Sequence, residues 1–384
     1  MQSAYRQSSR MASDVLALPS KYGKLYEEFI VSNASSIGSI ESALRSLTYI
    51  IPGRFRDAEI ASESLHSGVQ LLSLYHDSLL ARAVARLPKA QRPHPSPHNR
   101  YTRYWTKHSS TYRRLALTLQ VIQYTELLCE MAAKRRGEKA RWRVVTLLES
   151  LKAICRLLLL RLTNSRPLLS PPLPEREVDP STLEDNSSNN SGIESPPSER
   201  SEETQWTMPR TGLSLPTLPS SGDISSYLLS KVLTADDVKP PKALLHRVGG
   251  LGEAAEILYI LRPVIYAFAM AYYARRGHKA AWQPWLLGLA MEYGARQLAK
   301  RDVADHRAGG LRGLTALEKD ELKKRGWGLA WWAMRGAFYE TYTRRLIHGV
   351  SQSLKGKPLL DMAGGIIEDY EFLWDQYYFP TATL

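Results

Sequence analysis

The stretch that decides the fold runs from Ile257 to Ala290 and reads ILYILRPVIYAFAMAYYARRGHKAAWQPWLLGLA. Its first eighteen residues, up to Ala274, carry a single charge, that of Arg262, which is followed at once by Pro263. An apolar helix of about 20 residues covers the hydrocarbon core of a bilayer. The length therefore fits a membrane segment, whereas the charge in its middle also fits a helix buried inside a large helical protein.

The residues after this run are of the kind that a membrane–water interface selects. A basic cluster comes first and two tryptophans follow it. Indole and long basic side chains suit such an interface because they keep a polar end in water and an apolar body buried. We expect membrane contacts in residues 257–290 and 327–342, and the candidates are Tyr266, Phe268, Tyr272, Arg275, Arg276, Trp282, Trp285, Trp331 and Trp332.

Apolar residues elsewhere recur at spacings of three and four, which is the spacing of one helix face. Two such patterns on either side of Pro52 and Gly53 predict a pair of packed helices, an αα-hairpin. No strand-like alternation of useful length occurs. The sequence therefore predicts an all-α fold, a multi-helix bundle with amphipathic and membrane-associated helices, interrupted by a disordered acidic linker.

A helix after the basic break at residues 134–137 has two contrasting faces. One face is aliphatic and the other carries Glu149, Lys152 and Arg156. Such a helix can lie in a membrane interface or pack against its neighbours. We expect its aliphatic face to pack inside the protein; that face consists of Val144, Leu147, Leu151, Ile154, Leu158 and Leu162.

Composition divides the chain into four parts. Residues 1–20 are expected to be flexible, and 21–163 form an N-terminal helical domain. Residues 164–223 are rich in Ser and Pro and carry nine acidic residues between Glu175 and Glu203, so they are predicted to be a disordered linker. Residues 224–384 form a C-terminal helical, membrane-associated domain.

The chain carries 51 Lys and Arg against 38 Asp and Glu, a formal net charge of +13. This balance favours anionic partners, which include acidic lipid headgroups, acidic proteins and nucleic acid. A basic helical nucleic-acid-binding protein and a soluble helical scaffold are therefore alternatives. We expect no nucleic acid, because the tryptophans lie among aliphatic residues and not within a basic strip.

Motifs of known chemistry are absent from the sequence. It contains no G-x-x-x-x-G-K-[ST], no H-E-x-x-H, no C-x-x-C and no G-x-S-x-G. Cys129 and Cys155 lack metal-ligand spacing and are expected to be buried and reduced. We therefore expect no enzyme and assign no catalytic, cofactor-binding or metal-binding residue.

Three separated patches are residues 44–80, residues 262–293 and the aromatic tail, and their best markers are Gly53-Arg54-Phe55 after a helix, Arg262-Pro263, and Trp282-x-Pro284-Trp285-Leu286. Together they resemble the peroxin-16 family of peroxisomal membrane biogenesis proteins. The likeness covers residues 20–163 and 225–380.

The resemblance implies a non-enzymatic protein of the peroxisomal membrane and of the endoplasmic reticulum. It also implies that peroxin-3 and peroxin-19 are partners in the insertion of other peroxisomal membrane proteins, and that the chain influences peroxisome division.

The family is described as spanning the membrane twice, and this sequence departs from a simple two-span pattern. Its candidate spans, residues 115–133 and 257–274, contain Glu126, Glu130 and Arg262. A charge near a helix centre costs about 2.5–3.5 kcal/mol on insertion. The sequence therefore favours a monotopic or tightly peripheral attachment, and two spans stay open if those charges pack against protein.

Overall fold

A computed structural model describes residues 25–26, 29–30, 33–50, 59–86, 95–176, 239–278, 281–306, 313–354 and 360–382. These parts of the chain are helical and contain no strand, which confirms the prediction of an all-α bundle. The expected flexible residues 1–20, residues 177–223 of the predicted linker and the Gly53-Arg54-Phe55 motif lie outside the described residues.

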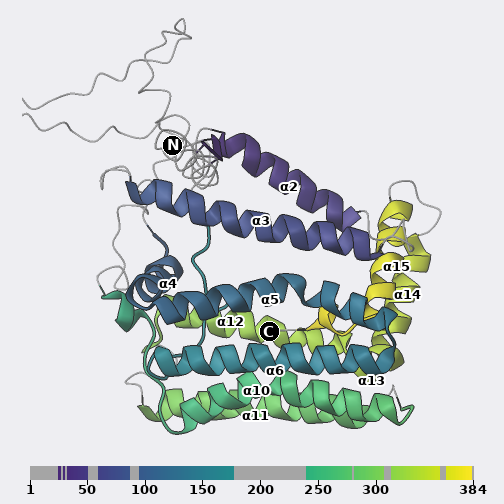
Figure 1. Ribbon diagram of the computed structural model, residues 1–384. Coiled ribbons are helices and arrows are strands. Elements are labelled where there is room, and N and C mark those ends of the chain that lie inside the picture. Colours follow the sequence, from purple (N-terminus) through teal and green to yellow (C-terminus); the bar gives the residue numbers. More distant parts are fainter. Residues whose placement is uncertain are drawn as a thin grey trace, which may run out of the picture.

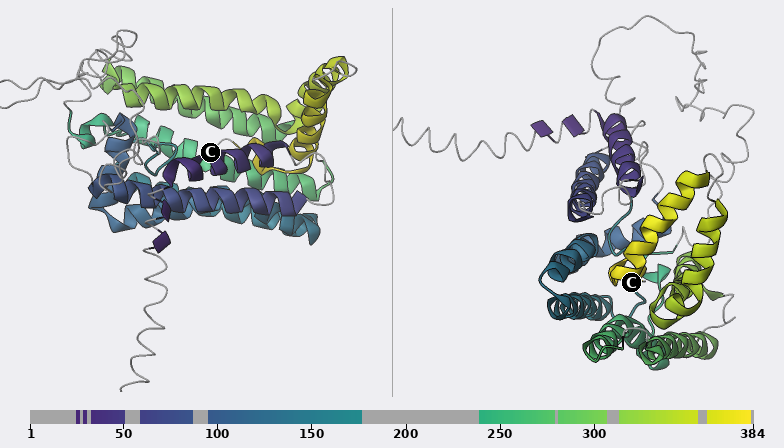
Figure 2. Two further views of the ribbon diagram at one scale, coloured as in Figure 1. Left: turned by 90° about the horizontal axis from the view of Figure 1, so that it is seen from above. Right: turned by 90° about the vertical axis from the view of Figure 1, so that its right-hand side faces the viewer.

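Long helices stand side by side in one curved row (Figures 1 and 2). Each helix of the row packs mainly on the helices next to it. In order along the row they are α2 (Ala34–Ile50), α3 (Glu59–Arg86), α5 (Ser110–Arg135), α6 (Glu138–Leu162), α10 (Leu251–Arg275) and α11 (Trp282–His306).

Shorter elements form a second layer on the inner side of this row, and two of them, α14 and α15, cross its end (Figure 1). The layer consists of α4 (Pro97–His108), η4 (Pro241–Leu244), α12 (Ala316–Ala330), η6 (Trp331–Met334), α13 (Gly336–Phe338), η7 (Tyr339–Thr343), α14 (Arg344–Leu354), α15 (Leu360–Gln376) and η8 (Phe379–Thr381).

Local sequence signals account for several helix ends. The Ser96 side chain accepts a hydrogen bond from the Asn99 amide at the start of α4, where Pro97 occupies the first turn. Thr315 and Glu318 form the expected capping box at the start of α12. Gly137 adopts a φ of 116° between α5 and α6, a backbone angle that suits glycine and lets the chain reverse direction in one step.

The two predicted helical domains share their hydrophobic cores. Trp142 and Val145 of α6 pack in one cluster with Tyr266 of α10 and Tyr378 near the chain's end. A second cluster joins α4, α5 and α6 to η4 and α12. The boundary expected between residues 163 and 224 therefore does not separate two cores in the described residues.

The first part of the predicted linker, residues 164–176, is ordered and packed. Leu169 and Leu173 are buried in the core next to α4 and α5. Arg176 pairs with Asp77 of α3 at 2.5 Å and with Glu41 of α2 at 3.0 Å. The linker boundary predicted at residue 164 was therefore too early, because apolar leucines in this stretch offset the entropy of ordering it.

Candidate membrane-contacting surface

Helix α6 places its charged face inside the protein. Glu149, Lys152 and Arg156 are between 0% and 5% exposed. The opposite aliphatic face is open, with Leu147 and Ile154 63% and 54% exposed. This arrangement reverses the expectation that the aliphatic face would pack inside the protein. In water the opposite orientation would be favoured. Charged side chains are almost never fully buried in water-soluble proteins, and leucines are stabilised by burial and not by exposure to water.

The buried charges of α6 are paired across to the neighbouring helix. Lys152 Nζ donates to Glu126 of α5 at 2.8 Å and to Glu149 at 3.0 Å. It also lies over the Phe379 ring of η8, 5.0 Å from its centroid. Pairing of this kind compensates the large cost of removing single charges from water.

Glu130 of α5 is completely buried, and its carboxylate accepts several hydrogen bonds. It accepts a hydrogen bond from Arg141 Nε at 2.8 Å. It also accepts from the backbone amides of Tyr378 at 2.8 Å and Phe379 at 3.1 Å. Both carboxylates that stood against a span in α5, those of Glu126 and Glu130, therefore pack against protein.

Arg262, the charge in the middle of α10, is 1% exposed. It forms an ion pair with Glu292 of α11, and its guanidinium lies over the rings of Tyr259 and Trp332. Pro263 is buried beside it. The charge that interrupts the apolar run thus faces the neighbouring helix and the second layer.

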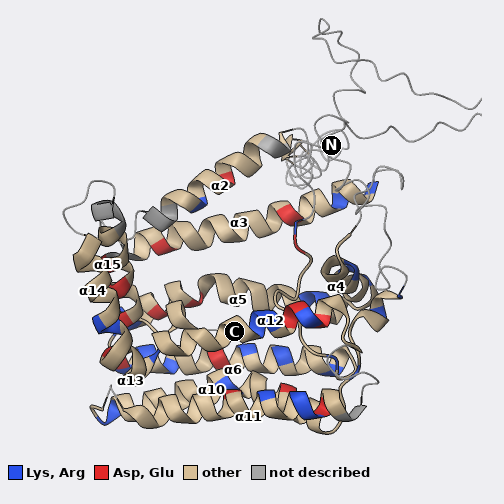
Figure 3. Ribbon diagram, turned by 180° about the vertical axis from the view of Figure 1, so that it is seen from behind, with Lys and Arg blue, Asp and Glu red and all other residues tan. Residues whose placement is uncertain are grey.

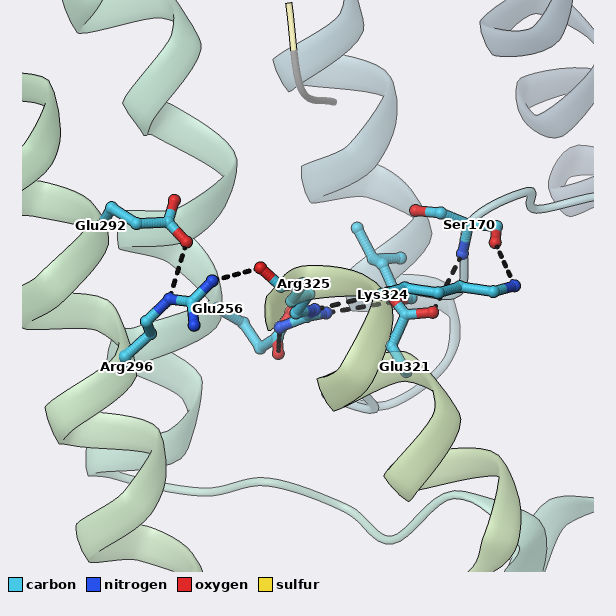
Figure 4. Close-up of polar contacts among 8 residues, drawn as sticks. Ser170, Glu256, Glu292, Arg296, Glu321, Lys324 and Arg325 are labelled. Carbon is cyan, nitrogen blue, oxygen red and sulfur yellow. Dashed lines mark hydrogen bonds and ion pairs between the residues drawn. The ribbon is translucent and has the colours of Figure 1, made fainter. Parts of the chain in front are cut away.

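A network of paired charges continues from this point toward α12 (Figure 4). Glu292 also accepts from Arg296 Nε at 2.9 Å. Arg325 of α12 donates to both carboxylate oxygens of Glu256 in α10, at 2.6 and 3.1 Å. Burial opposes the charge on Arg325, but Glu256 outweighs it, so the pKa of this guanidinium is raised above its usual value.

The same network reaches the ordered start of the linker. The Glu321 carboxylate accepts a hydrogen bond from the Ser170 backbone amide at 3.4 Å. Lys324 Nζ donates a hydrogen bond to the Ser170 carbonyl at 3.0 Å (Figure 4). Burial raises the pKa of the Glu321 carboxyl, although Arg325 opposes the shift. These contacts fix α12 against residues 164–176, on the inner side of the row.

The outward faces of four long helices lack exposed charges over most of their length. On α6 no exposed charged residue lies between Arg143 and Arg161, and on α5 none lies between Arg114 and Arg135. On α10 none is exposed from its first residue to Tyr272. At 1.5 Å per residue the α6 interval of 161 − 143 = 18 residues is ~27 Å long, close to the ~30 Å of a hydrocarbon core.

Helix α11 completes this surface. Its first charged residue is the buried Glu292, and its exposed charged residues begin at Lys300, toward the end of the helix (Figure 3). We call the large apolar side chains exposed on α5, α6, α10 and α11 the apolar band. Its members are Leu117, Val121, Leu147, Leu151, Ile154, Leu158, Leu251, Ile257, Phe268, Tyr272, Trp282, Leu286, Leu287 and Tyr293.

Helix α10 is long and apolar enough to cross a membrane by itself. Its 25 residues contain an 18-residue window with a mean hydropathy of 1.5, of which 44% is buried inside the protein. No other helix among the described residues meets the same criteria of length and hydropathy. A core helix of a soluble protein can also meet them, so the band of four helices is the stronger observation.

The predicted membrane contacts divide into exposed and buried residues. Phe268, Tyr272, Trp282 and Trp331 are 37–56% exposed. Arg275 and Arg276 at the end of α10 are also exposed, and Trp285 is half-buried.

The prediction of membrane contact is wrong for Tyr266 and Trp332. Each side chain is only 2% exposed and faces protein. Their rings meet edge to face at a centroid distance of 5.3 Å, and Tyr266 stacks on Tyr378 at 5.9 Å. Pro284, the remaining motif residue, is buried as well. These parts of the motifs hold the fold together from inside.

Sequence reasoning favoured internal packing for the aliphatic face of α6, which the structure leaves exposed. The signal lay in the charged face, whose members recur at the spacing of an inner helix face and are flanked by Arg143 and Arg161 at the two ends. No group of His, Cys, Asp and Glu in the described parts of the chain has the arrangement of a metal site.

Comparison with known proteins supplies the family. A family model described as peroxisomal membrane protein (Pex16) matches residues 24–376, nearly the whole chain. The chain belongs to the Pex16 family. The Pex16 family consists of membrane proteins of peroxisome biogenesis, and the chain is accordingly a protein of the peroxisomal membrane.

Two relatives of the Pex16 family extend over most of the chain. Peroxisomal membrane protein PEX16 of Schizosaccharomyces pombe is 23% identical over 345 residues, which are 86% of this chain and 89% of the relative. Peroxisome biogenesis protein 16 of Arabidopsis thaliana is 24% identical over 361 residues, 87% of this chain and 93% of the relative. No solved structure matches the chain.

Proposed function

We propose that this protein is a non-enzymatic docking factor that is embedded in the peroxisomal membrane through its apolar band. There it recruits other peroxins so that further membrane proteins are inserted, and it takes part in organelle division. By family resemblance the partners are peroxin-3 and peroxin-19, and the endoplasmic reticulum is a second location. The observation that carries the membrane attachment is the outward aliphatic face of α6 above its buried charges.

Integral insertion is favoured over a peripheral attachment. The sequence-based objection to a span came from Glu126, Glu130 and Arg262, and all three are paired within the protein. A lipid-facing surface then carries no exposed charge over these intervals, which suits a bilayer because polar groups in the hydrocarbon core have to be satisfied within the protein. The basic ends of the helices lie where anionic headgroups attract them.

The hairpin of α2 and α3 is the proposed docking surface for peroxins. It stands at one end of the helix row, and only α3 of the pair packs on α5 (Figure 1). Leu65, Leu72 and Tyr75 of α3 are 45–47% exposed and share one helix face. An amphipathic partner helix can cover such a row of residues at helical spacing.

The membrane attachment is tested by placing charges in the apolar band. Leu151→Asp combined with Ile154→Asp is expected to prevent stable insertion, so that alkaline carbonate releases the chain from isolated peroxisomal membranes. Lys139→Asp is the matched control, since Lys139 is exposed near the start of the same helix and lies beyond the band. If the double variant resists carbonate as the unaltered chain does, the band faces water and the proposal is wrong.

Docking is tested by capture of peroxin-3 and peroxin-19 from detergent extracts. Leu65→Asp with Tyr75→Asp is expected to reduce capture at least tenfold, because two apolar contacts are replaced by buried charges. Ala81→Asp is the control, because Ala81 is exposed on the opposite face of α3. If both variants capture the peroxins equally well, the docking surface does not lie on this face of α3 and the proposal is wrong.

A further inference from the structure

A cavity of about 190 Å³ opens at one end of the helix row. Its walls come from the start of α6, the end of α10, the turn between η6 and η7, and the residues around η8. Nothing in the peroxin-docking role accounts for it. Among the residues that line it are Arg335, Trp142 and Tyr339, which are 3%, 6% and 3% exposed.

Each of these three side chains holds a buried hydrogen-bond donor without a partner among the described residues. The donors are Arg335 Nη2, Trp142 Nε1 and Tyr339 Oη. Burial raises the pKa of Tyr339 to about 12, so its hydroxyl keeps its proton at neutral pH. Buried donors are almost always satisfied in folded proteins, and a buried donor without a partner destabilises the protein. Three in one cavity wall indicate that an acceptor is missing.

Arg335 adds a positive charge to this arrangement. Its Nε donates to the Thr381 carbonyl at 2.6 Å, and its guanidinium lies over the rings of Tyr266, Trp332 and Tyr378. No carboxylate of the described residues forms an ion pair with it. A buried cation is costly unless a counter-charge accompanies it.

The carboxylates in the cavity wall have partners of their own. Glu138 pairs with Arg141 at 3.4 Å, and Asp375 pairs with Arg344 at 3.6 Å. Glu340 is also engaged. Among the described residues, Arg335 is the one cation of the cavity wall that lacks a carboxylate partner, and the acceptor that its guanidinium lacks is therefore an anion.

The position of the cavity indicates what carries that anion. Trp142 immediately precedes Arg143, where the apolar band of α6 begins. Met270 and Ala274 of α10 line the cavity just before Arg275 and Arg276. This is the level at which lipid headgroups meet the protein if the band lies in the hydrocarbon core.

We propose that the cavity binds the phosphate of an acidic membrane lipid, held by Arg335 Nη2, Trp142 Nε1 and Tyr339 Oη, with Met270 and Ala274 beside the start of its acyl chains. The volume suits a small headgroup and excludes a whole phospholipid, so the acyl chains extend from the cavity along the protein. This inference rests on the proposed membrane embedding and adds a ligand to it.

The test uses the full chain purified in an uncharged detergent. Dioctanoyl phosphatidic acid, dioctanoyl phosphatidylcholine and inorganic phosphate are titrated separately, and adducts are counted by native mass spectrometry alongside the Tm. One molecule of phosphatidic acid is expected to bind to each protein chain and to raise its Tm. Phosphatidylcholine and inorganic phosphate are expected to bind at least tenfold more weakly.

The variant Trp142→Phe with Tyr339→Phe removes two donors and keeps two rings. We expect it to weaken phosphatidic acid binding by at least roughly tenfold, since two hydrogen bonds to a charged group are lost. Tyr101→Phe with Trp105→Phe is the matched control. Those residues also carry unpartnered buried donors, but they lie in the other core cluster.

Several results would overturn the lipid site. Equal binding of inorganic phosphate would assign the cavity to a free anion, and equal binding of phosphatidylcholine would remove the need for an acidic headgroup. Equal loss in both double variants would reduce the effect to core packing. A chain that resists carbonate extraction yet binds no phosphatidic acid contradicts this inference and leaves the membrane embedding intact.

Discussion

Glu130 is the residue on which the two halves of the chain converge. Its carboxylate joins α5 to Arg141 in α6 and to the backbone of residues 378 and 379. Removing it leaves two buried amides without an acceptor and leaves Arg141 with only its partly exposed partner Glu138. Glu130→Ala is therefore expected to destabilise the protein by about 3–5 kcal/mol, as loss of one partner of a buried pair does.

Thermal unfolding in detergent measures this loss. Glu138→Ala is the control, because Glu138 also pairs with Arg141 but its side chain is 47% exposed. Exposed pairs contribute only about 0–1 kcal/mol. Equal Tm values for the two variants would contradict the structural role given to Glu130.

Glu41 makes the α2–α3 contact sensitive to acid. Burial alone would raise the pKa of its carboxyl, but a hydrogen bond from His76 and the charge of Arg176 outweigh burial and hold that pKa below the usual 4.5. A group whose pKa is lowered by folding stabilises the folded state above its unfolded pKa. That stabilisation is lost as the pH falls below about 4.5 and through the lower folded value.

Hydrogen exchange of α2, corrected for intrinsic exchange rates, is expected to accelerate as the pH falls below about 4.5. Glu41→Gln should show faster exchange at pH 6 and little further change on acidification. A variant that keeps the full pH response would assign that response to another group.

At the scale of the element, the helix positions followed from the sequence and the orientation of α6 did not. Periodicity identified an aliphatic face with Leu147 and Ile154 and a charged face with Glu149 and Lys152. Which face turns inward depends on the surrounding solvent, and local sequence contains no information about solvent. Tyr266 and Trp332 were misplaced for the same reason, since aromatic residues serve both interfaces and cores.

Helix α11 and η6 approach each other too closely for any residue but glycine at position 288. A Cβ built on Gly288 would overlap the Trp332 indole. Gly288→Ala is therefore expected to displace Trp332 and cost about 1–3 kcal/mol, as overpacking does. Gly294→Ala on the same helix would meet Leu258 at an ordinary 3.7 Å, and should stabilise the helix by up to ~1 kcal/mol.

Urea unfolding or Tm values of the two alanine variants, measured side by side, decide the matter. A stable Gly288→Ala variant would show that the indole can rotate away without loss.

At the scale of the whole molecule, the residues around η8 hold the helix row together from inside. Tyr378 contacts Trp142 of α6 and Tyr266 of α10, and Phe379 lies beside Lys152. Truncation after Gln376 is expected to lower stability by roughly 3–6 kcal/mol through loss of these two buried rings alone. The pairing of Glu130 is lost in addition.

Truncation after Ala382 retains all of these contacts and serves as the control. Limited proteolysis of the purified chains should cut the shorter one in α6 and α10 and spare the longer one. Resistance of both chains would mean that the helix row is stable without its inner tail.

The link from residues 378 and 379 back to Glu130 also constrains how the protein is made. The Glu130 carboxylate accepts hydrogen bonds from the backbone amides of Tyr378 and Phe379, which follow it in the sequence by 248 and 249 positions. During translation α5 and α6 emerge long before those amides exist, with a polar face that has no cover. The contacts of Glu130 with residues 378 and 379 can therefore form only after residue 379 has left the ribosome.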